Sequence, residues 1–143
     1  MGLKQIDHGT KDYEEMVRLR RQILRQPLGL DFSPEELASE KEEILMASFE
    51  DDEMLGCCML TKTDEPGVLR LRQMAVPKNL QGKGIGAALL LFAENIARDK
   101  GYKKITMHAR DTAIGFYERS GYHLSGEKFL ELGIPHHIME KSL

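Results

Sequence analysis

The sequence contains little cysteine and no long apolar run. Its two cysteines, Cys57 and Cys58, are adjacent. Neighbouring side chains on a strand point to opposite faces, so we expect no disulfide between them, which suits a reducing cytosol. No stretch is apolar for long enough to cross a bilayer, and no apolar segment follows a basic start as in a signal peptide. We therefore predict a cytoplasmic protein without a membrane partner.

The sequence also lacks an excess of positive charge. Its 143 residues carry a net charge of −3, whereas general nucleic-acid binders are normally basic, so we expect no nucleic-acid partner. We find no internal repeat, low-complexity segment or linker in it. A chain of this length can bury a core of its own, and we predict one domain over residues 1–143.

What the chain does have is glycine concentrated in one place. Gly82, Gly84 and Gly86 alternate between a predicted strand over residues 68–76 and a predicted helix that begins near residue 85. Glycine lets the backbone bend freely and lets a phosphate approach closely. The first amides of a helix have no internal partner and carry the positive end of the helix dipole. The glycine loop therefore predicts an anion-binding site.

Two nucleotide-binding motifs do not fit this loop. A P-loop has lysine followed by serine or threonine after its last glycine, but Lys83 is followed by Gly84. The dinucleotide fingerprint G-x-G-x-x-G needs a third glycine where the chain has Ala87 or Leu89, although alanine is sometimes accepted there. No Asp or Glu stands at the end of a following strand about 20 residues further on. A nucleotide-binding module is therefore the weaker alternative.

The remaining pattern predicts a mixture of strands and helices. We expect helices at about residues 10–26, 34–41, 85–100 and 113–119, and strands at about 3–6, 44–49, 54–61, 68–76, 103–108, 122–125 and 134–140. The succession of strand, glycine loop, helix and strand is a crossover, which makes its two strands parallel. We expect the rest of the sheet to be mostly antiparallel, in an α+β or mixed α/β fold.

Polar residues predict where several helices begin. Ser33–Glu36 forms a capping box with proline at the first helical position, and we expect Thr10 and either Asp111 or Thr112 to cap two further helices. The first helix carries four arginines: Arg18, Arg20, Arg21 and Arg25. We interpret them as a solvated basic face, with one arginine that reaches an anionic acceptor as the sharper alternative.

The glycine loop and its flanks resemble the GNAT acetyltransferase superfamily. Gln81–Gly86 matches the family signature Q/R-x-x-G-x-G/A, Met74–Pro77 resembles the segment before it, and Ala113–Tyr122 resembles the segment A-x-x-F-Y-E-K-x-G-F after it. Residues 19–29 and 129–136 are similar to a subgroup of small bacterial members, so the resemblance covers nearly the whole chain. It implies a splayed, mostly antiparallel sheet of about six or seven strands, flanked by about four helices.

The resemblance implies acetyl-CoA as co-substrate and no metal. In this family the pyrophosphate lies on loop amides, which here belong to Gln81, Gly82, Lys83, Gly84, Ile85, Gly86 and Ala87. The pantetheine arm pairs with the central strand, whose N–H groups can stabilise an oxyanion, here at Met74, Ala75 and Val76. The Lys83 side chain either touches a phosphate or is a solvated lysine, and the sequence favours neither. Arg110 stands where many relatives have an asparagine that contacts the cofactor, so we do not carry that contact over.

Attack of an amine on a thioester requires two proton transfers. The leaving thiolate needs a proton, since a free thiol titrates near ~8.5. Tyr117 stands at the general-acid position of the family and its phenol is protonated at neutral pH; simple packing is the alternative role. The amine must lose a proton, and the central strand has Arg72 and Gln73 where some relatives carry glutamate. The base stays open between water and four side chains: His108, Glu131, His136 and His137.

These observations predict an N-acetyltransferase that moves an acetyl group from acetyl-CoA to a primary amine by direct attack in a ternary complex. The alternative is a catalytically weak sensor or regulatory protein that binds acyl-CoA. We expect the partner to be a small-molecule or peptide amine and leave a homodimer open. The acceptor itself is not predicted, because loops and the first two helices build acceptor sites and no motif is present there.

Overall fold

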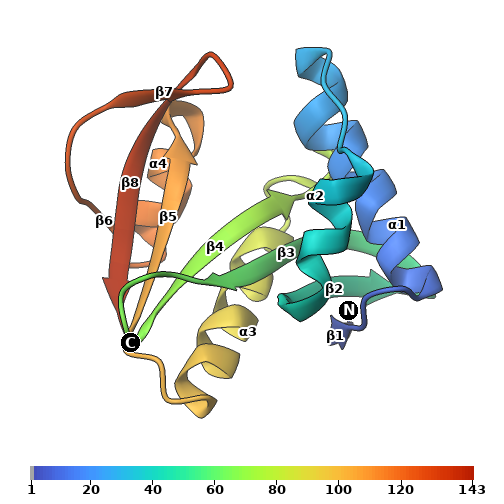
Figure 1. Cartoon of the computed structure of the whole chain (residues 1–143), viewed down its shortest axis with the longest axis horizontal. Helices are drawn as coiled ribbons and strands as arrows, with labels where there is room; N and C mark the ends of the chain where they lie inside the picture. Colours follow the sequence, from blue (N-terminus) through green and yellow to red (C-terminus); the bar gives the residue numbers. More distant parts are fainter. Residues whose placement is uncertain (1) are drawn as a thin grey trace.

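One mixed sheet forms the centre of this computed structural model, which describes residues 2–143 (Figure 1). Its strands are β1 (Gly2–Ile6), β2 (Ile44–Glu50), β3 (Glu53–Lys62), β4 (Val68–Ala75), β5 (Lys104–Arg110), β6 (His123–Leu124), β7 (Phe129–Glu131) and β8 (Ile134–Ser142). They follow the order β1-β2-β3-β4-β5-β8-β6, with β7 paired to β8. The β4–β5 pair is parallel and its neighbours are antiparallel. The predicted fold class is confirmed, with eight strands where six or seven were expected.

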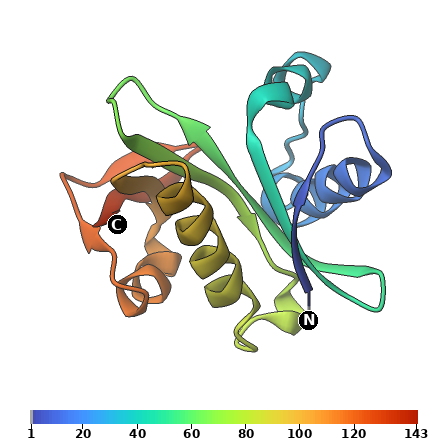
Figure 2. The same cartoon turned by 90° about the horizontal axis from the view of Figure 1, so that it is seen from below.

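Helices cover both faces of this sheet: α1 (Lys11–Arg20), α2 (Pro34–Ala38), α3 (Ile85–Asp99) and α4 (Ile114–Arg119). Figures 1 and 2 show α1 and α2 on one face and α3 and α4 on the other. Cys57 belongs to the core on the α1 side and Cys58 to the core on the α3 side. Both thiols are free, which confirms the predicted absence of a disulfide. Among residues 2–143, no helix is long and apolar enough to span a membrane.

The parallel strands β4 and β5 pair over only part of their length. Their register runs from Val68 opposite Lys104 to Leu71 opposite Met107, although both strands continue beyond these residues. A bulge bends β4 at this point. Arg72 and Ala75 of β4 both pair with β3, and between them β4 has two residues, Gln73 and Met74, where β3 has only one, Cys58. Gln73 accordingly adopts a φ of 56°. Beyond the last pair the two strands diverge, and β4 turns toward α1 (Figure 1).

Two of the three predicted helix caps are confirmed. Thr10 Oγ1 accepts a hydrogen bond from the Tyr13 amide at 3.3 Å, and Ser33 Oγ accepts one from the Glu36 amide at 3.1 Å. The third prediction is wrong, because α4 follows a 3₁₀ turn (η5, Asp111–Ala113) and has no side-chain cap. The carboxylate of Asp111 contacts His137 and Lys128 instead.

The first predicted helix is α-helical only up to Arg20. A π-helical turn (η1, Arg21–Arg25) and a 3₁₀ turn (η2, Gln26–Leu28) follow α1 before Gly29 ends the helical stretch with a φ of 71°. Three arginines of this stretch pair with carboxylates of the next segment: Arg20 with Glu40, Arg21 with Asp31 and Arg25 with Glu36. A solvated face therefore describes exposed Arg18 but is wrong for Arg20, which is fully buried.

Candidate functional site

The glycine loop connects the end of β4 to the start of α3. Met74 and Ala75 are the last residues of β4, and a 3₁₀ turn (η4, Lys78–Leu80) separates them from the glycines. The side-chain amide of Gln81 donates to the carbonyl of Val76 at 3.0 Å and ties the loop back to the strand. The residues predicted to bind the cofactor therefore form one continuous segment beside the point where β4 and β5 diverge.

Each glycine of this loop has its own physical reason. Gly82 and Gly84 have φ values of 81° and 84°, which residues with a side chain rarely adopt. A Cβ added to Gly86 would lie 3.1 Å from Cζ of Phe116 in α4, so glycine permits close packing between the loop and this helix.

The start of α3 presents unpaired amides. The first hydrogen bond of the helix joins the Ala88 amide to the Gly84 carbonyl at 3.0 Å. The amides of residues 82–87 form no backbone hydrogen bond within the described chain. Unpaired amides at the positive end of a helix dipole are suited to bind an anion. The side chain of Lys83 is exposed beside them and makes no ion pair with a described residue.

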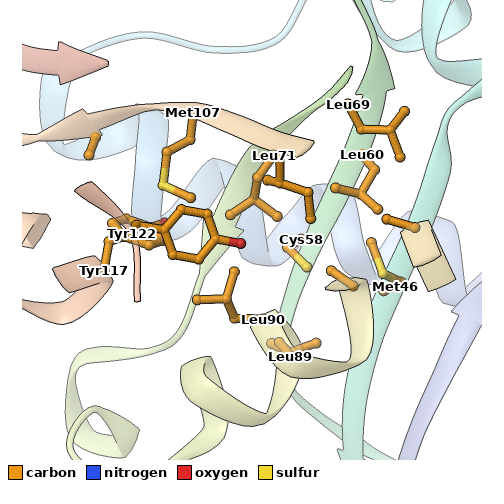
Figure 3. Close-up of a cluster of buried hydrophobic side chains, with 14 of the residues drawn as sticks. Met46, Cys58, Leu60, Leu69, Leu71, Leu89, Leu90, Met107, Tyr117 and Tyr122 are labelled. Atoms are coloured by element: carbon orange, nitrogen blue, oxygen red, sulfur yellow. The ribbon is translucent and has the colours of Figure 1, made fainter. Parts of the chain in front are cut away.

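Tyr117 lies in the core between α4, α3 and the sheet. Its side chain is 7% exposed and packs edge to face on Phe116 and Tyr122, with ring centroids 4.9 and 5.9 Å away. Figure 3 shows this core, to which β4 and α3 contribute leucines. Burial, and to a lesser degree the nearby Cys58, raises the pKa of the Tyr117 phenol above its ordinary value. The hydroxyl therefore keeps its proton at neutral pH.

A polar cluster occupies the opposite face of the sheet. The Nδ1 atom of His108 lies 2.9 Å from Oε1 of Glu131 and 2.9 Å from a guanidinium nitrogen of Arg70. His136 Nε2 lies 3.7 Å from the other oxygen of Glu131. The Phe129 ring contacts both imidazoles, with centroids 5.1 Å from His108 and 5.9 Å from His136. Three of the four predicted base candidates therefore meet in one cluster.

His137, the fourth candidate, does not belong to this cluster. It pairs in register with Ala109, which lies in the core on the α3 side. Its Nδ1 atom is 3.0 Å from Asp111, whose other oxygen pairs with Lys128 at 2.8 Å. Since neighbouring residues on a strand point to opposite faces, His136 and His137 have separate surroundings.

Burial and nearby charges shift the pKa of two groups in this cluster, Glu131 and Arg70. Burial opposes ionisation of Glu131, but the hydrogen bond from His108 and the positive groups around it outweigh burial and hold the pKa of the carboxyl below its usual range. Burial also lowers the pKa of Arg70, and the like charge of Arg72 adds to this effect. The Nε atom of Arg70 is buried and has no hydrogen-bond acceptor among residues 2–143.

Two features of the cluster were not anticipated from the sequence. Arg70 was overlooked, although its alternation with Leu69 and Leu71 in the predicted strand signalled a polar face. Strand β7, which carries Glu131, was also missed because it has only three residues. The signal for its hairpin was Gly133, which follows Leu132 in a turn where both residues have positive φ values.

The chain is similar in sequence to known acetyltransferases. Residues 24–143 match a family model described as an acetyltransferase (GNAT) domain. The chain is 31% identical over 108 residues to YjcF of Bacillus subtilis (strain 168), described as an uncharacterized N-acetyltransferase, covering 75% of this chain and 74% of YjcF. Two other relatives from the same organism align over 50% and 49% of their own length, so the chain spans about half of them.

Solved structures with low sequence identity share the fold. The crystal structure of a "putative N-acetyltransferase" from Lactobacillus plantarum superposes with a TM-score of 0.85 at 23% identity and covers 100% of this chain and 99% of that one. A crystal structure of an aminoglycoside 6'-N-acetyltransferase complexed with coenzyme A has a TM-score of 0.82 at 16% identity and covers 99% and 97% of the two chains.

Proposed function

Because the chain belongs to the GNAT acetyltransferase family, we propose that it transfers an acetyl group from acetyl-CoA to a primary amine within a ternary complex. One observation carries this proposal: β4 and β5 separate beside a loop of unpaired amides. Tyr117 lies on one face of the sheet there and the His108–Glu131 cluster on the other. Groups that can donate and accept protons therefore stand on either side of the separated strands.

The residues of the loop suit the pyrophosphate of acetyl-CoA. The unpaired amides of residues 82–87 and the positive end of α3 favour an anion, and exposed Lys83 adds a positive charge. After the bulge, residues Met74, Ala75 and Val76 have no partner on β5, although Ala75 still pairs with Cys57 of β3. On the β5 side this segment therefore offers backbone groups to the pantetheine arm and to an oxyanion. A structural relative solved with coenzyme A supports this assignment. The thioester would supply an activated acetyl group.

Tyr117 would give the departing thiolate its proton. Its buried phenol keeps the proton at neutral pH because its pKa is raised. A positioned general acid contributes about 10²- to 10⁴-fold to a rate. The ring also packs against Phe116, which contacts Gly86 of the loop, so the same helix would place both the acid and the cofactor loop.

His108 would remove the proton from the amine. An amine with a pKa of ~10.4 needs about 4.6 kcal/mol to become neutral at pH 7. A neutral imidazole that donates from Nδ1 to Glu131 leaves the lone pair on Nε2, which can then accept a proton. If Nδ1 instead accepts from Arg70, Nε2 carries a proton and cannot act as the base. Glu131 therefore favours the active tautomer, whereas Arg70 favours the inactive one.

A ligand and turnover assay tests this function. Thermal melting is measured with acetyl-CoA, CoA, NAD and ATP, and thiol release is then followed with a panel of primary amines. We expect stabilisation by acetyl-CoA and CoA, and thiol release that depends on an amine. Stabilisation by CoA species without turnover of any amine would instead support the acyl-CoA sensor. Stabilisation by NAD or ATP alone would overturn the proposed function.

A further inference from the structure

The face of the sheet that carries His108 is rich in basic side chains. We call the set Arg70, Arg72, His108, Arg110 and His136 the basic face. The residues share this face because strand residues two apart point to the same side and because β5 and β8 place Arg110 directly opposite His136. The alternate residues of β4 and β5, including Leu71 and Met107, lie in the core on the α3 side.

Of the three arginines on the basic face, only Arg70 has a carboxylate partner in the described part of the chain. Glu131 contacts His108, Arg70 and His136 at 2.9, 3.7 and 3.7 Å, and among residues 2–143 no other carboxylate forms an ion pair with the basic face. Arg72 makes neither an ion pair nor a side-chain hydrogen bond in the described chain, although it is only half exposed. The charge of Arg72 contributes to the lowered pKa of Glu40, but both carboxylate oxygens of Glu40 already accept hydrogen bonds from Arg20.

Three arginines of the neighbouring helical segment show a different pattern. Arg20, Arg21 and Arg25 each have a carboxylate within 2.6 to 2.8 Å. Arg110 has no such partner among the described residues, and its guanidinium reaches only the Leu24 carbonyl in η1 at 3.4 Å. These three arginines of the helical segment therefore each have a carboxylate partner, whereas Arg72 and Arg110 of the sheet have none among the described residues. Unbalanced guanidinium groups are suited to bind a carboxylate or phosphate in two-point contacts.

The position of the basic face links it to the acceptor amine. Arg72 and His108 follow directly after Leu71 and Met107, the last residues of β4 and β5 that pair. They therefore stand where the strands begin to separate, beside the proposed reaction centre. The contact of Arg110 with Leu24 places η1 over the same end of β5. An acceptor that presents its amine to His108 would meet these guanidinium groups.

We propose that the acceptor is an amine that also carries a carboxylate or phosphate group, which Arg72 and Arg110 bind while the amine faces His108. This inference rests on the proposed function. In the reaction, the amine nitrogen forms a bond to the acetyl carbon and the thioester carbon–sulfur bond breaks. The ammonium first loses one proton to water by way of His108. As the amide forms, His108 takes the second proton from the nitrogen and Tyr117 protonates the leaving thiolate, and proton exchange with water then restores the imidazole and the phenol. The anionic group of the acceptor is unchanged and serves only to bind and orient it.

Matched pairs of acceptors test the proposal directly. Amino acids are compared with their carboxamides, and phosphoethanolamine with ethanolamine, at equal concentrations of acetyl-CoA. We expect kcat/KM to be at least about tenfold higher for the anionic member of one pair, since charge-assisted hydrogen bonds have about that effect or more. The pair that shows the preference distinguishes a carboxylate from a phosphate. Equal or better turnover of the members without an anionic group would overturn the proposal while leaving the acetyltransferase function intact.

Variants of the basic face provide the second test. Arg72→Gln and Arg110→Gln should raise KM for the anionic acceptor about ten- to hundredfold and abolish the preference over the carboxamide or ethanolamine. KM for acetyl-CoA should stay within about twofold. Arg72→Lys should retain part of the preference. Arg18→Gln is the matched control, because Arg18 is exposed on α1 and lies outside the basic face; an equal effect of this variant would contradict the assignment.

A binding measurement extends the test to protein without turnover. Calorimetric titration of the CoA-loaded protein should detect the preferred anionic amine in the wild type, and Arg72→Gln should weaken its binding about tenfold or more. If CoA binds but no amino acid or phosphoethanolamine does, the acceptor proposal is refuted. If CoA itself does not bind, the proposed function fails first, and the two failures are thereby distinguished.

Discussion

The imidazole of His108 and the carboxylate of Glu131 meet at 2.9 Å although they are 23 positions apart in the chain. His108 lies on β5, and Glu131 comes from β7, which pairs with neighbouring β8. The contact therefore depends on the register of two strand pairs. Since Arg70 lies equally close to the same nitrogen, the balance between Glu131 and Arg70 determines which imidazole nitrogen carries the proton.

Replacement of Glu131 by Gln is expected to lower kcat/KM for the amine about 10²-fold or more, because an amide no longer favours the tautomer with a free Nε2. The affinity for acetyl-CoA should not change, since the loop of residues 82–87 is on another segment. Steady-state kinetics and titration with acetyl-CoA measure the two effects.

The matched control for this variant is Glu127→Gln, at an exposed glutamate outside the cluster. Its kcat/KM should equal that of the wild type. A second variant, Arg70→Gln, should keep or raise activity with an amine that has no anionic group, because it removes the competing donor to His108. Normal activity of Glu131→Gln would exclude the proposed orientation of His108.

Replacement of Tyr117 by Phe should lower kcat about 10²-fold or more and leave the affinity for acetyl-CoA within about twofold. The ring packing on Phe116 and Tyr122 is kept, so only the proton is lost. Tyr102→Phe, at a half-buried tyrosine between α3 and β5, serves as control. Single-turnover thiol release separates this effect from slow product release, and unchanged turnover would assign Tyr117 to packing alone.

Replacement of Gly82 by Ala should weaken acetyl-CoA binding about tenfold or more, because an alanine at a φ of 81° shifts the loop amides. Gly9→Ala is a close control, since Gly9 has the same φ of 81° and open space around it but lies before α1. Both variants should lose about 1 kcal/mol of stability.

Thermal melting and calorimetric titration distinguish the two glycine variants. The melting temperature should fall similarly in both, whereas only Gly82→Ala should bind acetyl-CoA more weakly. Equal affinities in the two proteins would show that the loop amides do not hold the cofactor.

Replacement of Glu40 by Gln should lower the free energy of unfolding at pH 7 by about 3–5 kcal/mol, because it leaves buried Arg20 without its counter-ion. Burial opposes ionisation of Glu40, but the hydrogen bonds and charge of Arg20 and the Tyr13 hydroxyl outweigh burial and hold the pKa of the carboxyl below its ordinary value. The stabilisation is therefore complete above the unfolded pKa of ~4.3 and is lost as the pH falls through the folded value.

Urea unfolding between pH 7 and pH 3 measures this dependence. The difference between wild type and Glu40→Gln should be constant near neutral pH and shrink in acid. The control is Asp12→Asn, which breaks an exposed pair with Lys4 and should cost at most about 1 kcal/mol. A difference that did not shrink in acid would show that the ionised carboxylate is not what stabilises this contact.

Local patterns predicted much of the fold. Alternating apolar residues indicated most strands, and the caps at Thr10 and Ser33 were correct because a cap depends on residues three positions away. The pairs of Arg20 with Glu40 and of His108 with Glu131 were not predictable in the same way. They join residues 20 and 23 positions apart, and nothing local in the sequence specifies which carboxylate a given cation meets.

The sequence by itself determined the glycine loop and the crossover that carries it, because glycine conformation and helix ends depend on neighbouring residues. The tertiary structure alone decided which of four base candidates lie together. A shift of one residue in strand register turns every side chain to the other face, and this is why His136 lies in the cluster while His137 contacts Asp111. It also decided that Arg72 stays without a carboxylate, since only the folded sheet determines which charges meet.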